Sequence, residues 1–170
     1  MKAWRFYGFG DMRLDDVPTP PLRPGHVLAQ ILCVQPSVTE AQLAFGIPTL
    51  AFEAIKRRLE SEAPVQLFGH EYCARILETG EGVTRFQTGD RVAARAKLPC
   101  GQCALCNDGR AHLCRKGPII GFQLPGCFSE YAVLPEIALT LVHDDISDSE
   151  AACLQSLSDS VAAVETARVR

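Results

Sequence analysis

The sequence predicts a mainly β domain with a few helices, and two observations carry that prediction. The 170 residues include 47% hydrophobic and 22% charged side chains without a shift in composition along the chain, which suits one well-cored domain. Short apolar runs rich in valine, isoleucine and leucine fill the first half and are separated by glycine and proline, as in β-barrels and β-sandwiches.

Strands are predicted in the apolar segments MKAWRFYG, HVLAQILCV, VQLFGHEYCARILETG and DRVAARA, with turns at PTPPLRPG and TGD. One interruption, residues 50–64, contains Phe52, Ile55 and Leu59 at roughly helical spacing with charged residues between them. Pro64 marks the limit of this segment. The pattern predicts a surface helix.

A second helix is predicted near the end of the sequence. Ser147 is followed three residues later by Glu150, which is the pattern of a capping box. The box would open one alanine-rich helix that continues through residue 167.

Charge and hydropathy exclude several classes of function. The chain carries 17 basic and 20 acidic residues, and the basic ones are scattered except for the run 56–58, which lies among glutamates. This is not the basic footprint of a nucleic-acid-binding protein. The opening MKAWRFYGFGDMRL has no apolar stretch behind its charges, so we expect neither a signal peptide nor a membrane anchor, and we expect a cytoplasmic protein.

Four of the eight cysteines lie in one short loop, PCGQCALCNDGRAHLC, at residues 99–114. Cytoplasmic thiols stay reduced, so clustered cysteines are more often metal ligands than disulfide partners. Gaps of two, two and seven residues let the loop fold its sulfur atoms around one tetrahedral zinc ion, with turns at Gly101 and Gly109. The predicted ligands of this structural zinc, one ion per chain, are Cys100, Cys103, Cys106 and Cys114.

Two alternatives exist for this loop. A ferredoxin-type cluster would need a gap of three residues and a proline at the last cysteine, whereas seven residues intervene here and Arg115 follows. Reduced thiols without a metal are the second alternative. Because four thiolates fill the coordination shell of zinc, we expect the loop to stabilise a lobe rather than catalyse, and His112 inside it is surplus.

A candidate reactive centre lies outside the loop, at Gly69-His70-Glu71 in the context of a predicted strand. A His-Glu pair on a strand points its side chains to opposite faces, so the pair alone is a weak sign of chemistry. A hydrogen-bonded histidine beside an exposed carboxylate is the structural alternative.

Three stretches in this order resemble a known family: GHE followed by GEGVTRFQTGDRV, then the cysteine loop, then GFQLPGCFSEYAV. They are similar to the GroES-like catalytic domain of the zinc-containing medium-chain alcohol dehydrogenases, and the resemblance covers nearly the whole chain. It implies a GroES-like, partly open β-barrel with a zinc-binding loop lobe over residues 1–170. It also implies an oxidoreductase that transfers hydride between NAD(P) and an alcohol or carbonyl.

The resemblance further implies a catalytic zinc held by three side chains, of which one matches. His70 matches the histidine ligand, and Glu71 matches the glutamate beside it. The family's cysteine corresponds to Ser37, and its late acidic or sulfur ligand corresponds to Gln155. A neutral hydroxyl and a neutral amide bring no negative charge to zinc, so the sequence favours a metal-free pocket, with a catalytic zinc at His70 as the alternative.

Two more pocket residues follow from the same resemblance. Thr39 matches the hydroxyl that relays the substrate proton, and a turn or capping threonine is its structural alternative. Glu40 stands where the family has an aspartate that orients the histidine. The expected catalytic residues are therefore Thr39, Glu40, His70 and Glu71.

The nicotinamide cofactor of the family binds a Rossmann unit with G-x-G-x-x-G after a strand. The nearest match, Gly80 to Arg85, lacks the third glycine, and we interpret it as a turn. We therefore expect the cofactor domain to lie C-terminal to residue 170 and this chain alone to bind no dinucleotide. The resemblance implies a small-molecule substrate and is compatible with a homo-oligomer.

Two other functions stay open at this point. The missing zinc ligands favour a zinc-independent reductase of the same superfamily that acts on an activated double bond. The third hypothesis is a zinc-stapled binding module without enzyme activity, which would use the surface from Arg115 to Phe128.

Overall fold

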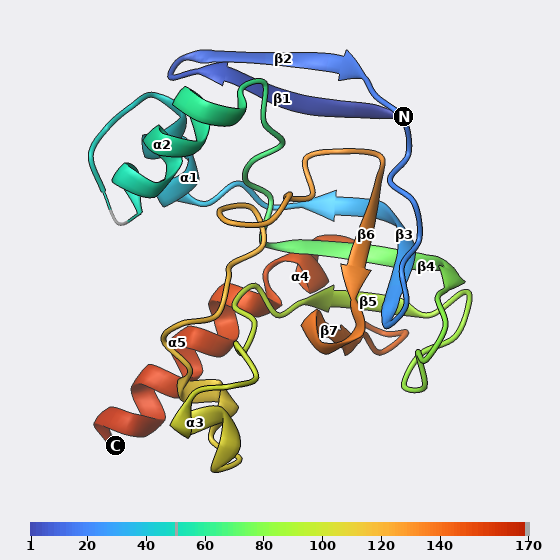
Figure 1. The fold of residues 1–170 in the computed structure, drawn as a ribbon. Coiled ribbons are helices and arrows are strands. Elements are labelled where there is room, and N and C mark those ends of the chain that lie inside the picture. The colour runs from blue at the N-terminus through green and yellow to red at the C-terminus, as the bar shows by residue number, and fades with distance from the viewer. Residues whose placement is uncertain (50, 169–170) are drawn as a thin grey trace.

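The structure is a computed structural model that describes residues 1–49 and 51–168, and its strands form two antiparallel sheets (Figure 1). The larger sheet has five strands in the order β6-β3-β4-β5-β7, and the smaller sheet pairs β1 with β2. The strands are β1 (Lys2–Gly8), β2 (Asp11–Asp16), β3 (His26–Val34), β4 (Tyr72–Thr79), β5 (Arg91–Ala94), β6 (Tyr131–Pro135) and β7 (Leu139–Leu141). The prediction of a mainly β fold with a few helices is confirmed.

Strand β3 lies inside the larger sheet and has the bounds that the sequence predicted. Because successive side chains of a strand point to opposite faces, Val27 and Ala29 share the inner face, where both are fully buried. Ala29 pairs with Ile76 of β4, which is also fully buried. Apolar surface removed from water contributes about 25 cal/mol per Å². A slip of one residue would turn these side chains away from the core, so their burial fixes the register of the two strands.

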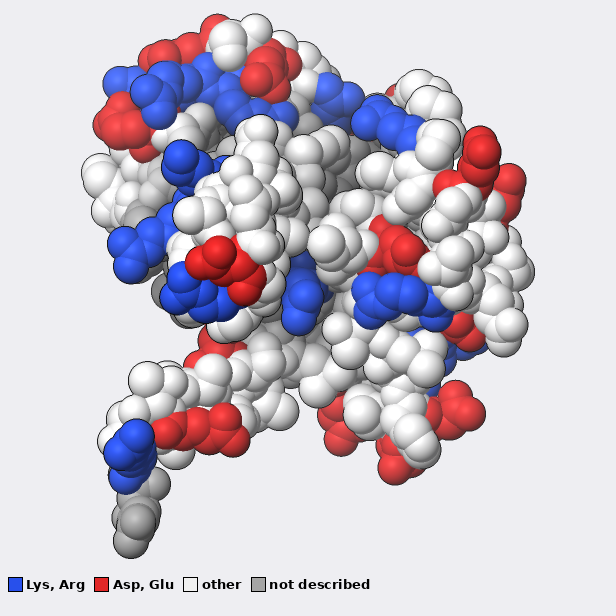
Figure 2. Space-filling model, turned by 60° about the horizontal axis from the view of Figure 1, so that its bottom comes forward, with Lys and Arg blue, Asp and Glu red and all other residues white. Residues whose placement is uncertain are grey.

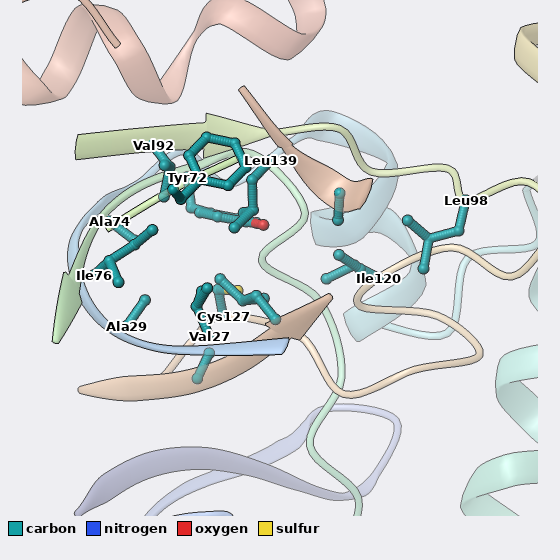
Figure 3. Close-up of a cluster of buried hydrophobic side chains, with 14 residues drawn as sticks. Val27, Ala29, Tyr72, Ala74, Ile76, Val92, Leu98, Ile120, Cys127 and Leu139 are labelled. Carbon is teal, nitrogen blue, oxygen red and sulfur yellow. The ribbon is translucent and has the colours of Figure 1, made fainter. Parts of the chain in front are cut away.

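Figure 3 shows the main hydrophobic cluster, in which side chains of β3, β4 and β5 point toward one another. Loop residues Leu98, Ile120 and Cys127 complete the same cluster. Tyr72 is fully buried in it and is the first residue of β4. The core therefore anchors the chain immediately after the Gly69-His70-Glu71 segment.

The helices are short except for the last one. They are α1 (Val38–Ala44), α2 (Phe52–Glu62), α3 (Ala104–Asn107), η1 (Ala111–Leu113), η2 (Glu136–Ala138), α4 (Asp148–Ala152) and α5 (Leu154–Ala167). Helix α2 is the predicted surface helix, because Ile55 is buried while Phe52 and Leu59 pack beside it. Helix α1 was not expected from the sequence.

The expectation of one continuous helix after Ser147 is wrong. The capping box is present, with the Ser147 hydroxyl accepting from the Glu150 amide and the Glu150 side chain accepting from the Ser147 amide. The helix nevertheless divides at Cys153, which ends α4 and precedes α5. The Cys153 amide donates to the Glu150 carbonyl three residues earlier, so the last turn of α4 tightens before α5 begins.

The expectation that His70 lies in a strand is also wrong. Strand β4 begins only at Tyr72. Phe68 and Gly69 both have left-handed backbone conformations, with φ of 62° and 79°. Two such residues in sequence turn the chain sharply, so His70 does not share the alternating geometry of β4.

The surface carries both signs of charge. Figure 2 shows basic and acidic side chains intermixed over one face of the molecule. Figures 1 and 2 also show that the C-terminal part of α5 projects away from the sheets. Among the described residues, no helix combines the length and the apolar character needed to cross a membrane.

Candidate active site and cysteine lobe

His70 lies between two carboxylates, one from α1 and one from its own chain neighbour. Its Nδ1 atom is 2.6 Å from Oε1 of Glu40, and its Nε2 atom is 3.5 Å from Oε1 of Glu71. Glu40 and Glu71 are both buried, with 2% and 4% of their surfaces exposed. The structure thus brings together three of the four residues that the sequence assigned to catalysis.

Glu40 is the anchor of this arrangement. Its Oε1 atom also accepts hydrogen bonds from the backbone amides of Gly69 at 2.7 Å and His70 at 3.3 Å. Consecutive amides that point at one anion form a nest, which the left-handed conformations of Phe68 and Gly69 create here. The other carboxylate oxygen accepts from the Ser37 amide in the capping box of α1. One side chain therefore fixes both the His70 ring and the backbone that carries it.

Gly69 is required for this geometry. Its φ is positive, and a Cβ atom added there would lie 2.7 Å from the backbone nitrogen of Phe128. The loop that contains Phe128 thus packs directly against the turn before His70. A side chain at this position would push the two segments apart and displace the imidazole.

Glu71 is held from the side opposite His70. Gln35 donates a hydrogen bond from Nε2 to Oε2 of Glu71 at 2.7 Å, and its Oε1 atom accepts from the Cys153 thiol. Sequence reasoning missed Gln35 and the role of Cys153, because neither residue belongs to a recognisable motif. The two side chains meet because α4, whose C-cap is Cys153, packs against β3 and β4.

The two carboxylates control protonation in this pocket. Burial lowers the pKa of His70, but hydrogen bonding to Glu40 and the charges of Glu40 and Glu71 outweigh it, so the net shift is upward. Burial raises the pKa of Glu71, which the charge of His70 opposes in part. The carboxylate of Asp159 on α5 raises both pKa values further.

An aromatic ring packs against His70. The Phe122 ring lies edge-on to the His70 imidazole, with ring centroids 5.5 Å apart, and it also contacts Phe68 at 6.0 Å. Arg58 of α2 donates to the Phe122 carbonyl and holds this loop in place. The His70 site therefore combines polar groups with an apolar ring beside them.

Thr39 lies on the first turn of α1, one residue before Glu40, and is partly buried. Its hydroxyl forms no hydrogen bond with any other described residue. It does not cap the helix, since Ser37 does. The hydroxyl is therefore free to donate and accept a proton.

Ser37 and Gln155, which correspond to two of the family's zinc ligands, do not suit a zinc ion. The Ser37 hydroxyl accepts from the Glu40 amide as the cap of α1, and Gln155 donates to Asp159 at 2.7 Å along α5. Both groups are neutral and already engaged. In the part of the chain that the structure describes, the only cluster of metal-binding side chains with suitable spacing is in the cysteine loop.

The four loop sulfurs, in contrast, converge on one point. The sulfur atoms of Cys100, Cys103, Cys106 and Cys114 all lie within 4.8 Å of one another. The site combines α3, η1 and the segments that flank them. Four sulfurs at this spacing suit a closed tetrahedral zinc site. His112 on η1 is exposed and does not join the cluster.

The environment of these thiols differs from one to the next. The pKa of Cys114 falls to about 6, chiefly because its sulfur accepts the backbone amide of Cys100. Burial raises the pKa of Cys106 to about 11. Amide donors to some of the sulfurs favour thiolates, which are the form that binds zinc.

Comparison with known proteins agrees with this fold. The alcohol dehydrogenase GroES-like domain matches residues 44–144. An L-threonine 3-dehydrogenase of Rhizobium etli (strain CIAT 652) is 33% identical over 149 residues, which cover 87% of this chain and 41% of the enzyme.

Solved structures give the same result. Galactitol-1-phosphate dehydrogenase from Escherichia coli has a TM-score of 0.84 at 24% identity, covers 99% of this chain and 45% of that one, and shows likeness of fold. A thermostable alcohol dehydrogenase from Pyrobaculum aerophilum has a TM-score of 0.74 at 29% identity and covers 91% of this chain and 44% of that one. The chain spans less than half the length of these relatives. Because the family match covers more than half of it, this chain belongs to the medium-chain alcohol dehydrogenase family, whose GroES-like domain it contains.

Proposed function

We propose that residues 1–170 form the catalytic domain of an NAD(P)-dependent oxidoreductase that transfers hydride between the nicotinamide and a small alcohol or carbonyl substrate. Support comes from the family match and from relatives named as threonine and alcohol dehydrogenases. The eight thiols are all free of disulfides, which is in keeping with a cytoplasmic protein.

The observation that carries this proposal is the placement of His70 between Glu40 and Glu71. When a hydride leaves carbon the attached oxygen loses its proton, and when a hydride arrives at carbon that oxygen gains one. The Nε2 atom of His70 and the free hydroxyl of Thr39 are the groups that would donate a hydrogen bond to that oxygen. Glu40 would keep the imidazole ring in the required orientation, as its 2.6 Å contact with Nδ1 suggests.

The cysteine lobe has a different role in this proposal. Its four sulfurs would hold a structural zinc, and a closed shell of four thiolates leaves no position for water or substrate. The metal would supply folding energy to residues 99–114 and no chemistry to the reaction.

The cofactor would be bound by a further domain. In the two sheets of the described residues the paired strands are antiparallel, so these sheets supply no parallel βαβ unit for a dinucleotide. Helix α5 also carries an exposed apolar stripe, in which Leu157, Val161 and Val164 are 56%, 47% and 55% exposed. Such a stripe suits a helix that packs against another domain.

The lack of anionic zinc ligands at positions 37 and 155 also supports a second candidate function. A reductase acting on a double bond conjugated to a carbonyl needs less polarisation of oxygen by a metal, and Ser37 and Gln155 supply no such metal site. Both candidate enzymes transfer a hydride to or from the nicotinamide, so substrate preference separates them.

The test is a substrate screen with the protein that contains this chain, in which the absorbance of reduced nicotinamide is followed. Alcohols, saturated carbonyls and α,β-unsaturated carbonyls are compared for the wild type and for His70→Ala. Turnover of alcohols and saturated carbonyls that falls about 100-fold or more in the variant supports the dehydrogenase. Turnover confined to unsaturated carbonyls supports the reductase, and no turnover with any class favours a binding module.

A further inference from the structure

An unbroken row of side-chain contacts runs from a buried carboxylate to the protein surface. It begins at Glu40, passes through both nitrogens of His70 to Glu71, and continues through Gln35 to the exposed thiol of Cys153. The first three contacts measure 2.6, 3.5 and 2.7 Å in that order, and in the fourth the Cys153 thiol donates to the Gln35 amide oxygen. Residues 35 and 153 come from opposite ends of the sequence, so the tertiary fold makes this connection.

Gln35 has the right chemistry for the central link. Its amide nitrogen donates to the Glu71 carboxylate while its amide oxygen lies at hydrogen-bonding distance from the Cys153 thiol. A carboxylate at position 35 could not donate to Glu71, and an aliphatic side chain could make neither bond. The Gln35 side chain thus holds Glu71 in place from the side that His70 does not occupy.

We propose that hydrogen bonds through Gln35, and not a metal ion, organise the His70 pocket, with Gln35 as the positioning residue for Glu71. The donor set supports this, because Ser37 caps α1, Gln155 bonds Asp159, and neither offers an anionic ligand. The proposal concerns how the pocket is built, so it stands or falls independently of whether the chain serves a dehydrogenase.

The first test counts zinc. The wild type and His70→Ala are each saturated with zinc, desalted and analysed for metal per chain. An equal count in the two proteins supports the proposal, whatever the loop cysteines hold. One ion fewer in His70→Ala would show a metal at the pocket and overturn the proposal.

A rebuilt site sharpens this test. The variant Ser37→Cys/Gln155→Glu restores a thiolate and a carboxylate and is expected to bind one more zinc than the wild type. Adding His70→Ala should remove that gain. If the double variant gains no zinc, Ser37 and Gln155 are not what keeps zinc away from His70.

The second test follows Gln35 itself. In Gln35→Leu we expect the ring nitrogen resonances of His70 to shift in ¹⁵N NMR spectra and the alkylation of Cys153 by iodoacetamide to accelerate several-fold. Gln30→Ala is the matched control, because Gln30 lies exposed on β3, the strand that ends one residue before Gln35, and it should change neither readout. Unchanged His70 resonances in Gln35→Leu would overturn the role of Gln35.

Cys153 tests the same connection from the exposed end, where substitution leaves the core intact. Cys153→Ala should shift the His70 resonances in the same direction, and Cys153→Ser, which keeps a donor, should restore them. If alanine and serine act alike, the thiol takes no part in positioning, and the surface end of the network is disproved.

Discussion

The Nδ1 atom of His70 lies 2.6 Å from Oε1 of Glu40, and the same oxygen accepts the backbone amides of Gly69 and His70. A carboxylate on α1 thus determines the position of an imidazole that precedes β4. This single contact couples the stability of the turn at residues 68–70 to the geometry of the pocket.

Replacing Glu40 should destabilise the domain. In Glu40→Ala the buried donors of Gly69 and His70 lose their acceptor, and we expect the free energy of unfolding to fall by about 3 kcal/mol. Urea denaturation followed by circular dichroism measures this change. Glu60→Ala, at an exposed position of α2, is the control and should change stability by less than about 0.5 kcal/mol. Equal effects of the two substitutions would contradict the anchoring role of Glu40.

The pocket should make stability depend on pH. The pKa of His70 is raised in the folded state, so its favourable contribution is fully present below the unfolded value of about 6.5 and is lost as pH rises through the folded value. The pKa of Glu71 is also raised, in its case by burial, so its ionisation costs stability as pH rises above about 4.3. Both groups therefore make the folded domain less stable as pH rises.

Unfolding free energies measured across this pH range for the wild type and for His70→Gln check the His70 contribution. The wild type should lose more stability than the variant as pH rises from about 6.5 into the alkaline range. Parallel pH profiles of the two proteins would mean that the carboxylates do not favour the imidazolium.

The cysteine lobe should depend on zinc. Removing the metal with a chelator, or substituting Cys106→Ser, is expected to lower stability by about 4 kcal/mol and the melting temperature by about 10 °C. Differential scanning calorimetry together with metal analysis checks both. His112→Ala should keep its zinc and its melting temperature, because the exposed imidazole does not join the four sulfurs. Loss of zinc in the His112 variant would mean that the ligand set is wrong.

Close packing of the loop near the pocket gives a further prediction. A Cβ atom at Gly126 would overlap the carbonyl oxygen of Phe68, so Gly126→Ala should cost about 3 kcal/mol or more. Gly8→Ala is the matched control, because nothing lies within 4 Å of its added Cβ and its φ is not positive. Thermal unfolding of the two variants compares them, and a tolerated Gly126→Ala would show that the loop does not pack on Phe68 as described.

Local patterns in the sequence predicted much of the fold. The short apolar run at residues 26–34 gave β3 with its correct bounds, and the spacing of Phe52, Ile55 and Leu59 gave α2. The Ser147 and Glu150 pair gave the start of α4. These features depend on residues that are neighbours in sequence, which is why they could be predicted.

Features that depend on tertiary contacts were missed. The break at Cys153 accompanies a contact with Gln35, which is 118 residues away in the sequence. The left-handed turn at Phe68 depends on the bond from its amide to the Gly121 carbonyl at 2.6 Å. Apolar composition around residue 70 predicted a strand, but these distant contacts decided the conformation there.

The cysteine loop could be predicted from local sequence, whereas the arrangement around His70 depends on tertiary contacts. Spacing alone grouped Cys100, Cys103, Cys106 and Cys114, and the four sulfurs do converge. The residues of the pocket could be assigned only through resemblance to a family. Their mutual distances, and the contribution of Gln35, required the structure.

The central claim is that reactivity belongs to the His70 pocket and not to the cysteine lobe. The most direct measurement is transfer of deuterium from nicotinamide-deuterated NAD(P)H to the carbonyl carbon of a substrate, detected by mass spectrometry, with the protein that contains this chain. We predict transfer by the wild type and a loss of about 100-fold in His70→Ala, with the zinc content of the lobe unchanged. Transfer that persists at the wild-type rate in His70→Ala would contradict the account.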